Sequence, residues 1–382
     1  MVFSARAQTI RTHKHKHNYT LNMKYCSIIL MGFILWSCSD SNGKDEVKPD
    51  VPDTTDPTTE LTSAIVNTDT EHSLESVVFI DEKTGFIAGG DILDKAATVI
   101  KTTDGGVTWT PVLSETGYIC NRITALSNQV LLVATNDKFI LKTSDAGKTW
   151  KKVDVSTKAI FMTDIKFMDD KRGYLVGSNG SNGVLLTTKD GGDTWEEVIK
   201  GHLLQETFLH NNLLSSITFT SQSSILIGGG TYSKGGVLRS DDAGVTWTKA
   251  SIDSDVQINN LAQLGDQVFA VGHNGQSSST EKGAMYSTID DGKTWTGVTT
   301  GFDNKLNSIA WRKQAICAVG RNKHNDLSNP EFIILSEDKG STWTRIKHDY
   351  VVAGWNDVCF ISDHKAIAVG YKGRAIVINL KQ

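Results

Sequence analysis

An octapeptide of the form (S/T)xDxGxTW occurs six times in the chain, ending at Trp109, Trp150, Trp195, Trp247, Trp295 and Trp343. Successive tryptophans are separated by 41, 45, 52, 48 and 48 residues. Periods in this range are typical of propellers and solenoids, in which one supersecondary unit is repeated. The chain also holds 34 glycines and only 5 prolines, which favours many short strands joined by tight turns over helices. The repeat therefore predicts an all-β array.

Each octapeptide has the composition of a hairpin turn. Its aspartate can accept hydrogen bonds from loop N–H groups and from the preceding Ser or Thr hydroxyl, and the glycine two places later can take a positive φ. The final tryptophan is predicted to bury its ring between neighbouring units. The pattern resembles the Asp-box, or BNR, repeat, whose aspartates we expect to be structural rather than catalytic. These are Asp104, Asp145, Asp190, Asp242, Asp290 and Asp338.

A second periodic feature sets the number of units. A polar pair enters an apolar strand before each octapeptide and once more near the end of the chain. The pairs are Glu75-Ser76, Asn121-Arg122, Thr163-Asp164, Ser215-Ser216, Asn259-Asn260, Asn307-Ser308 and Asn356-Asp357. Seven pairs predict a seven-bladed β-propeller. The last unit ends after three strands, so we expect the strand-like segment 61–68 to complete it, because closure protects the edge.

The first sixty residues are predicted to serve export rather than folding. Residues 1–37 form a leader whose start we place at Met23, because Lys24 and the apolar stretch that follows have signal-peptide proportions. Leu35-Trp36-Ser37-Cys38 resembles the lipobox of bacterial lipoproteins, which implies cleavage before Cys38 and its lipidation. An ordinary signal peptide is the alternative. Residues 38–60 hold seven acidic residues and three prolines and predict a disordered acidic tether, which leaves 61–382 for the propeller.

Charge and cysteine content restrict the partners. Residues 1–37 hold five of the 39 basic residues and none of the 43 acidic ones, so the remaining chain carries a net charge of −9. A nucleic-acid partner is not expected, because it requires a basic surface. The acidic tether resembles the surface-export signal of outer-membrane lipoproteins, which predicts an outer-membrane protein on the cell surface or the periplasmic side, held only by its lipid. Neither a metal nor a cofactor is predicted, since no CxxC, HExxH or phosphate-loop motif occurs.

Candidate ligand-binding residues lie where the loops between blades and between second and third strands meet. Charged, amide and aromatic groups that converge on a concave mouth suit a peptide or a sugar, so we predict a protein or glycan ligand there. The alternative is that the same side chains cap strand ends and bond one another. The candidates are Arg122, Asp164, Asn260, Arg321, Trp355, Asn356 and Asp357.

The repeat units resemble those of the Ycf48-like photosystem II stability and assembly factor family, as in DIKFMDDKRGYLVGSNGSNGVLLTTKDGGDTW at 164–195. The resemblance extends over about residues 65–382 and implies a propeller that acts as a binding or assembly scaffold. The basic patch of the photosynthetic members is not evident here, so the resemblance does not carry over the photosystem target.

Two functions of different classes follow from this fold. The first is a non-catalytic exported lipoprotein that binds a protein or glycan. The second is a glycoside hydrolase of sialidase type, which by resemblance would need an Arg-Ile-Pro motif, three arginines and a Tyr/Glu pair. No Arg-Ile-Pro sequence occurs, so the binding function is preferred and no enzymatic activity is expected.

Overall fold

The computed structural model describes residues 61–155, 161–180, 182–198, 213–231, 234–252, 256–274, 282–321, 331–348 and 354–381. Over these ranges all regular secondary structure is β-strand, and every sheet contains four antiparallel strands. They belong to the unit Asp56–Gln382. The leader, Cys38 and the tether lie outside the described residues, and the division of the chain at residues 37 and 60 stays a prediction.

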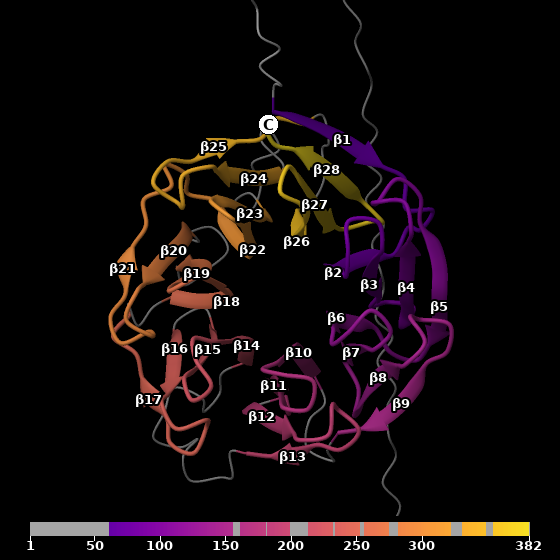
Figure 1. Cartoon of the computed structure of the whole chain (residues 1–382), viewed down its shortest axis with the longest axis horizontal. Helices are drawn as coiled ribbons and strands as arrows, with labels where there is room; N and C mark the ends of the chain where they lie inside the picture. Colours follow the sequence, from indigo (N-terminus) through magenta and orange to yellow (C-terminus); the bar gives the residue numbers. More distant parts are fainter. Residues whose placement is uncertain are drawn as a thin grey trace, which may run out of the picture. The chain divides into compact units, whose positions relative to one another are not determined.

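The sheets are the seven blades of a β-propeller, so the predicted fold is confirmed (Figure 1). Blade 1 is β2 (Ser73–Phe79), β3 (Gly85–Asp91), β4 (Ala96–Thr102) and β5 (Thr110–Thr116); blade 2 is β6 (Cys120–Ala125), β7 (Leu131–Thr135), β8 (Phe139–Thr143) and β9 (Lys151–Asp154). Blade 3 is β10 (Phe161–Phe167), β11 (Gly173–Ser178), β12 (Gly183–Thr188) and β13 (Glu196–Glu197); blade 4 is β14 (Leu213–Phe219), β15 (Ile225–Thr231), β16 (Lys234–Ser240) and β17 (Thr248–Lys249).

Blade 5 is β18 (Val256–Leu264), β19 (Gln267–Asn274), β20 (Lys282–Thr288) and β21 (Thr296–Gly297); blade 6 is β22 (Lys305–Arg312), β23 (Ala315–Arg321), β24 (Glu331–Ser336) and β25 (Thr344–Arg345). Blade 7 is β26 (Trp355–Ser362), β27 (Lys365–Gly370), β28 (Ala375–Asn379) and β1 (Thr62–Val66).

The apolar core lies between blades rather than inside one sheet. One cluster joins Phe86 and Val99 of blade 1 to Ile123 and Val133 of blade 2, all of them buried. Each second strand is covered on both faces, and β7 (LLVAT) is buried along its whole length. This burial explains why the second strands read as continuous apolar runs rather than alternating ones. A fully buried Leu, Val, Ile or Phe contributes about 1.5–3 kcal/mol, so stacking of the blades is the main source of stability.

The ring is closed by strands from both ends of the described chain. The strand β1 pairs with β28 antiparallel, with Thr62 opposite Asn379 and Val66 opposite Ala375. The innermost strands β2, β6, β10, β14, β18, β22 and β26 contact one another in order, and β2 also contacts β26 (Figure 1). The predicted completion of the last blade by an N-terminal strand is therefore confirmed.

The octapeptides join third to fourth strands, and in the first of them Asp104 organises the turn. Thr102 Oγ1 and Thr108 Oγ1 donate to the Asp104 carboxylate, and the backbone N–H groups of Val107 and Thr108 donate to Asp104 Oδ1 at 3.0 Å each. The Gly106 N–H donates to Thr102 Oγ1 at 3.0 Å. Each of the other five turns repeats the bonds from the flanking hydroxyls to its aspartate.

These bonds predict how stability depends on acid. Hydrogen bonds, chiefly from the threonine four residues later, lower the pKa of Asp145, Asp242, Asp290 and Asp338 to about 2. A carboxylate with a lowered folded-state pKa gives stability that is complete above the unfolded value and is lost as the pH falls towards the folded value. We expect the melting temperature to fall steeply between about pH 4 and 2. In Asp145→Asn that fall should be shallower, whereas Asp266→Asn, an exposed aspartate outside the turns, should keep the native slope. Equal slopes in the two variants would contradict the explanation.

Candidate functional site

Every polar pair contains a β-bulge. In all seven inner strands the pairing register shifts at the first residue of the pair, for example between Met162 and Asp164 and between Trp355 and Asp357. In six of them the side chain of the extra residue reaches the next blade, as expected where a bulge bends a strand. The pairs are thus features of backbone geometry as well as of composition.

Six bulge side chains donate a hydrogen bond to a backbone carbonyl at the corresponding place in the next blade. The bonds are Asn121 to Met162 (2.7 Å), Thr163 to Leu214 (2.6 Å), Ser215 to Ile258, Asn259 to Leu306 (2.7 Å), Asn307 to Trp355 (2.8 Å) and Asn356 to Leu74 (3.0 Å). Among the described residues, the seventh bulge residue, Glu75, makes no such bond. The ring of links is therefore interrupted between blades 1 and 2.

The second residues of three pairs meet at the propeller axis. Arg122 Nε lies 3.3 Å from Asp164 Oδ1, and Arg122 Nη1 lies 3.0 Å from Asp357 Oδ2. The arginine side chain is 21% exposed, whereas the two carboxylates are almost fully buried. Each buried carboxylate needs a partner to offset its desolvation, and the single arginine serves both.

The ion network reaches all seven blades. Asp164 Oδ2 accepts bonds from Ser216 Oγ at 3.0 Å and from the Ile217 N–H at 2.9 Å. Ser216 Oγ in turn accepts the Leu261 N–H at 3.1 Å. On the other side, Asp357 accepts Ser308 Oγ at 2.6 Å and the Val77 N–H at 3.0 Å. We call the set of Arg122, Asp164, Asp357, Ser216 and Ser308 the axial network.

Lys166 lies beside the axial network, two residues after Asp164 on the same strand. Its Nζ is 4.0 Å from Asp164 Oδ2 and donates to the Leu261 carbonyl at 3.2 Å. Burial lowers the pKa of Lys166, and the charge of Arg122 adds to this effect against the attraction of Asp164. Burial also acts to lower the pKa of Arg122, but Asp357 and Asp164 outweigh it and raise the pKa overall.

A cavity of about 560 Å³ follows the axis from the network along the later parts of the inner strands. Arg122 and Asp357 line one end of it, and Lys166, Trp311 and Arg312 line it further along. These strand ends lead into the turns between first and second strands, on the same face as the Asp-box turns. Trp311 is 39% exposed, and Arg312 is held by Asp363 at 2.6 Å. The cavity thus combines cationic groups with an exposed aromatic ring.

The opposite mouth, at the start of the inner strands, also holds charged groups. Lys305 Nζ lies 3.2 Å from Nε2 of His273. Burial lowers the pKa of this histidine to about 3, and the positive charges of Lys305 and Arg321 add to the effect. Burial also raises the pKa of Tyr371, with Glu75 adding to the rise and Arg321 opposing it. Arg321 and Glu75 therefore belong to one electrostatic neighbourhood.

The structure separates the predicted ligand residues into four groups. Arg122, Asp164 and Asp357 come together at the axis, whereas Arg321 lies at the mouth. Asn260 and Trp355 are buried, at 5% and 1% exposure, and the Trp355 ring is perpendicular to His348 at 5.8 Å. Asn356 is a bulge residue that bonds blade 1. The ligand role of all seven stays a prediction.

Sequence reasoning missed Lys166 and Trp311. Both follow a polar pair, Lys166 by two positions and Trp311 by three. Alternation along a strand places Lys166 on the same side as Asp164, and this was an available signal. In the described part of the chain, no group of three or more His, Cys, Asp or Glu side chains could hold a metal ion. Over the same ranges, no helix has the length and apolar character needed to cross a bilayer.

Substitution of Arg122 should destabilise the folded protein, because the axial network contains two buried carboxylates. Arg122→Gln leaves Asp164 and Asp357 buried with fewer compensating charges, so we expect a loss of about 3 kcal/mol in the free energy of unfolding. Arg312→Gln breaks an ion pair between partly exposed side chains and should cost less than about 1 kcal/mol. Urea denaturation of both variants checks the difference, and similar losses in the two would be inconsistent with a central role for Arg122.

Substitution of Glu75 should stabilise the folded protein, in contrast to substitution of Arg122. Burial raises the pKa of Glu75, and the charge of Asp357 adds to the rise. An acid with a raised folded-state pKa gives stability below its unfolded value that is lost as the pH rises through the folded value. The Glu75→Gln amide avoids this loss, and by analogy with Asn121 and Met162 we expect it to donate to the Cys120 carbonyl. We expect a gain of about 1 kcal/mol at pH 8 and little change at pH 4, with the exposed Glu71→Gln as the control.

Comparisons with known proteins agree on one family. The profile of the family described as photosynthesis system II assembly factor YCF48 matches residues 57–160 and 150–315. Two relatives are named photosystem II assembly lipoprotein Ycf48. The one from Prochlorococcus marinus (strain NATL2A) is 48% identical over 48 residues, 13% of each chain, and that from Synechococcus sp. (strain CC9902) is 32% identical over 105 residues, 28% of each chain. The matched segments thus span less than a third of either relative.

Solved structures share the fold at low identity. YCF48 bound to D1 peptide has a TM-score of 0.61 and 17% identity, with 84% of this chain and 97% of that chain covered. YCF48 from Cyanidioschyzon merolae gives 0.63 and 16%, with 83% and 98% covered. The GH74 enzyme from Niastella koreensis gives 0.63 and 15%, with 83% and 53% covered. The likeness to these structures shows the propeller fold alone, whereas the profile match spans most of the chain. The chain therefore belongs to the photosynthesis system II assembly factor YCF48 family.

Proposed function

We propose that the protein is a non-catalytic scaffold that binds a segment of a client protein at the propeller axis. The observation that carries this proposal is the axial cavity, which is lined from all seven inner strands and combines Lys166, Arg312 and the exposed ring of Trp311. A concave site with a few fixed polar groups and apolar surface suits a peptide segment. Membership of a family of assembly factors supports a protein client, as does the relative whose structure was solved with a D1 peptide.

The same geometry speaks against a glycoside hydrolase. The charge of Arg122 is already balanced by Asp164 and Asp357, so this arginine is not positioned to hold a substrate carboxylate. The Asp-box carboxylates are bonded within their own turns on six different blades, too dispersed to act as an acid/base pair. The likeness to the GH74 enzyme shows only the fold. A sialidase-type activity therefore has no observation in its favour.

Export and anchoring belong to the same proposal. Residues 1–37 would be the leader, with Met23 as the start, Cys38 would carry the lipid, and 38–60 would tether the propeller to the outer membrane, facing the cell surface or the periplasm. The relatives named as lipoproteins support the lipid anchor. A glycan at the mouth stays an alternative ligand. The client would be a protein of the same compartment.

Site-specific photo-crosslinking tests the axial site. A benzoylphenylalanine placed at position 311 of the full-length chain, in its own cells, should yield a discrete cross-linked protein identified by mass spectrometry, and Lys166→Met should weaken this product. The same group at Val245, which is 72% exposed on an outer Asp-box turn, is the matched control. No product at position 311, or the same products at both positions, would overturn the proposal.

A further inference from the structure

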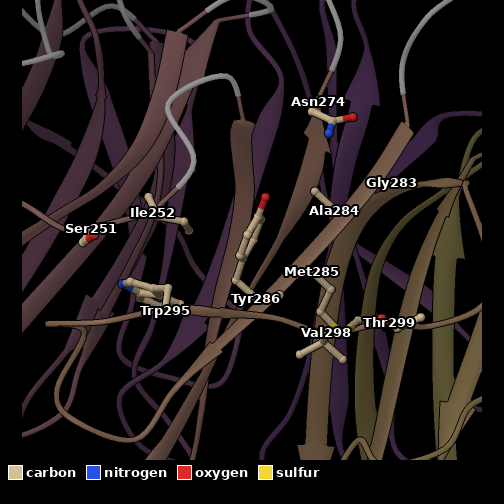
Figure 2. A pocket seen from close by; sticks show the side chains of 11 residues that line it. Ser251, Ile252, Asn274, Gly283, Ala284, Met285, Tyr286, Trp295, Val298 and Thr299 are labelled. Carbon is tan, nitrogen blue, oxygen red and sulfur yellow. The ribbon is translucent and has the colours of Figure 1, made fainter.

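A second cavity, of about 570 Å³, lies beside β20 on the side of blade 5 that faces blade 4. We call it the blade 5 pocket. Tyr286 and Trp295 form its aromatic side, Ile252 and Ser251 come from the connection after β17, and Asn274 and Thr299 lie at its edge (Figure 2). None of these residues belongs to the axial network, so the pocket is separate from the proposed protein-binding site.

The blade 5 pocket lies beside a short outer strand, a feature that blade 5 shares with blades 3, 4 and 6. The strand β21 contains only Thr296 and Gly297, which pair with Ser287 and Tyr286. In blade 1 the outer strand β5 runs from Thr110 to Thr116 and pairs along most of β4. The chain after Gly297 therefore leaves the sheet early, and the pocket lies along the part of β20 that a longer outer strand would accompany.

The described residues that line the blade 5 pocket are all uncharged. The axial cavity, by contrast, is lined by Arg122, Lys166 and Arg312. Charged residues make up 21% of the chain, so this contrast is informative for a site on the outer part of a blade. The described lining offers a charged ligand no counter-ion, and we expect an uncharged one.

Two aromatic rings give the blade 5 pocket its apolar surface. Trp295 Nε1 donates to the Gly292 carbonyl at 3.1 Å, so its polar edge is held in the Asp-box turn and its ring is only partly buried. Tyr286 is also partly buried, and Figure 2 shows its ring beside Ile252 with the hydroxyl directed towards the Asn274 side of the pocket. Partly exposed rings next to amide and hydroxyl groups suit a ligand with both apolar faces and polar edges.

An extended peptide fits this site poorly, although an open sheet edge often binds one. The Met285 carbonyl already accepts the Val298 N–H at 2.8 Å, and the Gly283 N–H already donates to the Asp303 carbonyl at 3.0 Å. These outward-facing backbone groups of β20 are therefore occupied, and a new strand could not bond to them. Recognition must come from the side chains.

We propose that the blade 5 pocket binds a neutral oligosaccharide. The apolar face of a sugar ring would pack against Tyr286 and Trp295, and its hydroxyl groups would bond Asn274, Ser251 and Thr299. This inference does not depend on the proposed protein-binding function, because it uses a different blade and different residues.

Isothermal titration calorimetry tests the inference. The protein is the chain from residue 39 to 382, which contains the tether and the whole propeller, and the probes are cellotetraose, maltotetraose, xylotetraose and mannotetraose. We expect at least one of these neutral probes to bind and the charged tetrasaccharide of hyaluronan not to bind. Trp295→Leu and Tyr286→Leu should each weaken the binding of that probe by about tenfold or more. Absence of binding for all four neutral probes would overturn the proposal.

Trp343→Leu is the matched control, because Trp343 Nε1 makes the same 3.1 Å bond to a glycine carbonyl, that of Gly340, in the next blade. It should keep native affinity, and an equal loss in this variant would show that the effect is structural. If Trp295→Leu does not fold, Tyr286→Leu alone decides the question. The cross-link at position 311 should persist in Tyr286→Leu, which separates failure of the sugar site from failure of the protein-binding proposal.

Discussion

The bridge that Arg122 makes between two buried carboxylates is the interaction on which the centre of the propeller depends. Its guanidinium joins Asp164 of blade 3 to Asp357 of blade 7, and each carboxylate then bonds a serine hydroxyl and a backbone N–H of a further blade. Without this arginine the two buried carboxylates would keep only their hydroxyl and N–H partners and the more distant Lys166, which compensate less of the hydration energy lost on burial. The blades are thus joined by apolar stacking at their faces and by charge at their inner edges.

The number of blades could be predicted from sequence because each blade carries the same turn chemistry and the same apolar runs. The polar pairs were also visible, and the alternative that their side chains bond one another holds for Arg122, Asp164 and Asp357, but the bulges were not predicted. A bulge depends on the register between two strands, and residue type alone does not reveal it: Glu75, Thr163 and Asn259 occupy equivalent bulges with different side chains. Trp355 was predicted at the mouth, but its position before a bulge turns the ring into the core.

The axial network also explains why repeats that look equivalent are not interchangeable. Ser76, Ser216 and Ser308 hold the second place of the pair in three blades, whereas Arg122, Asp164 and Asp357 hold it in three others. Only an asymmetric set of this kind can place one cation between two anions within a ring of seven similar strands. Chain connectivity sets the order of the blades, and the charges favour the closed ring in which blades 2, 3 and 7 meet at the axis.

Variation in the outer strands has a different consequence from variation at the axis. The inner strands must all reach the same channel, so their lengths are confined to six to nine residues, whereas the outer strands range from two residues in β21 to seven in β5. A shortened outer strand removes little of the core, because most residues of the apolar clusters belong to the inner three strands of neighbouring blades. Pockets such as that of blade 5 can therefore form beside the outer strands without disturbing the packing of the inner strands. This division allows one propeller to have a charged cavity at its axis and a separate pocket at the outer part of a blade.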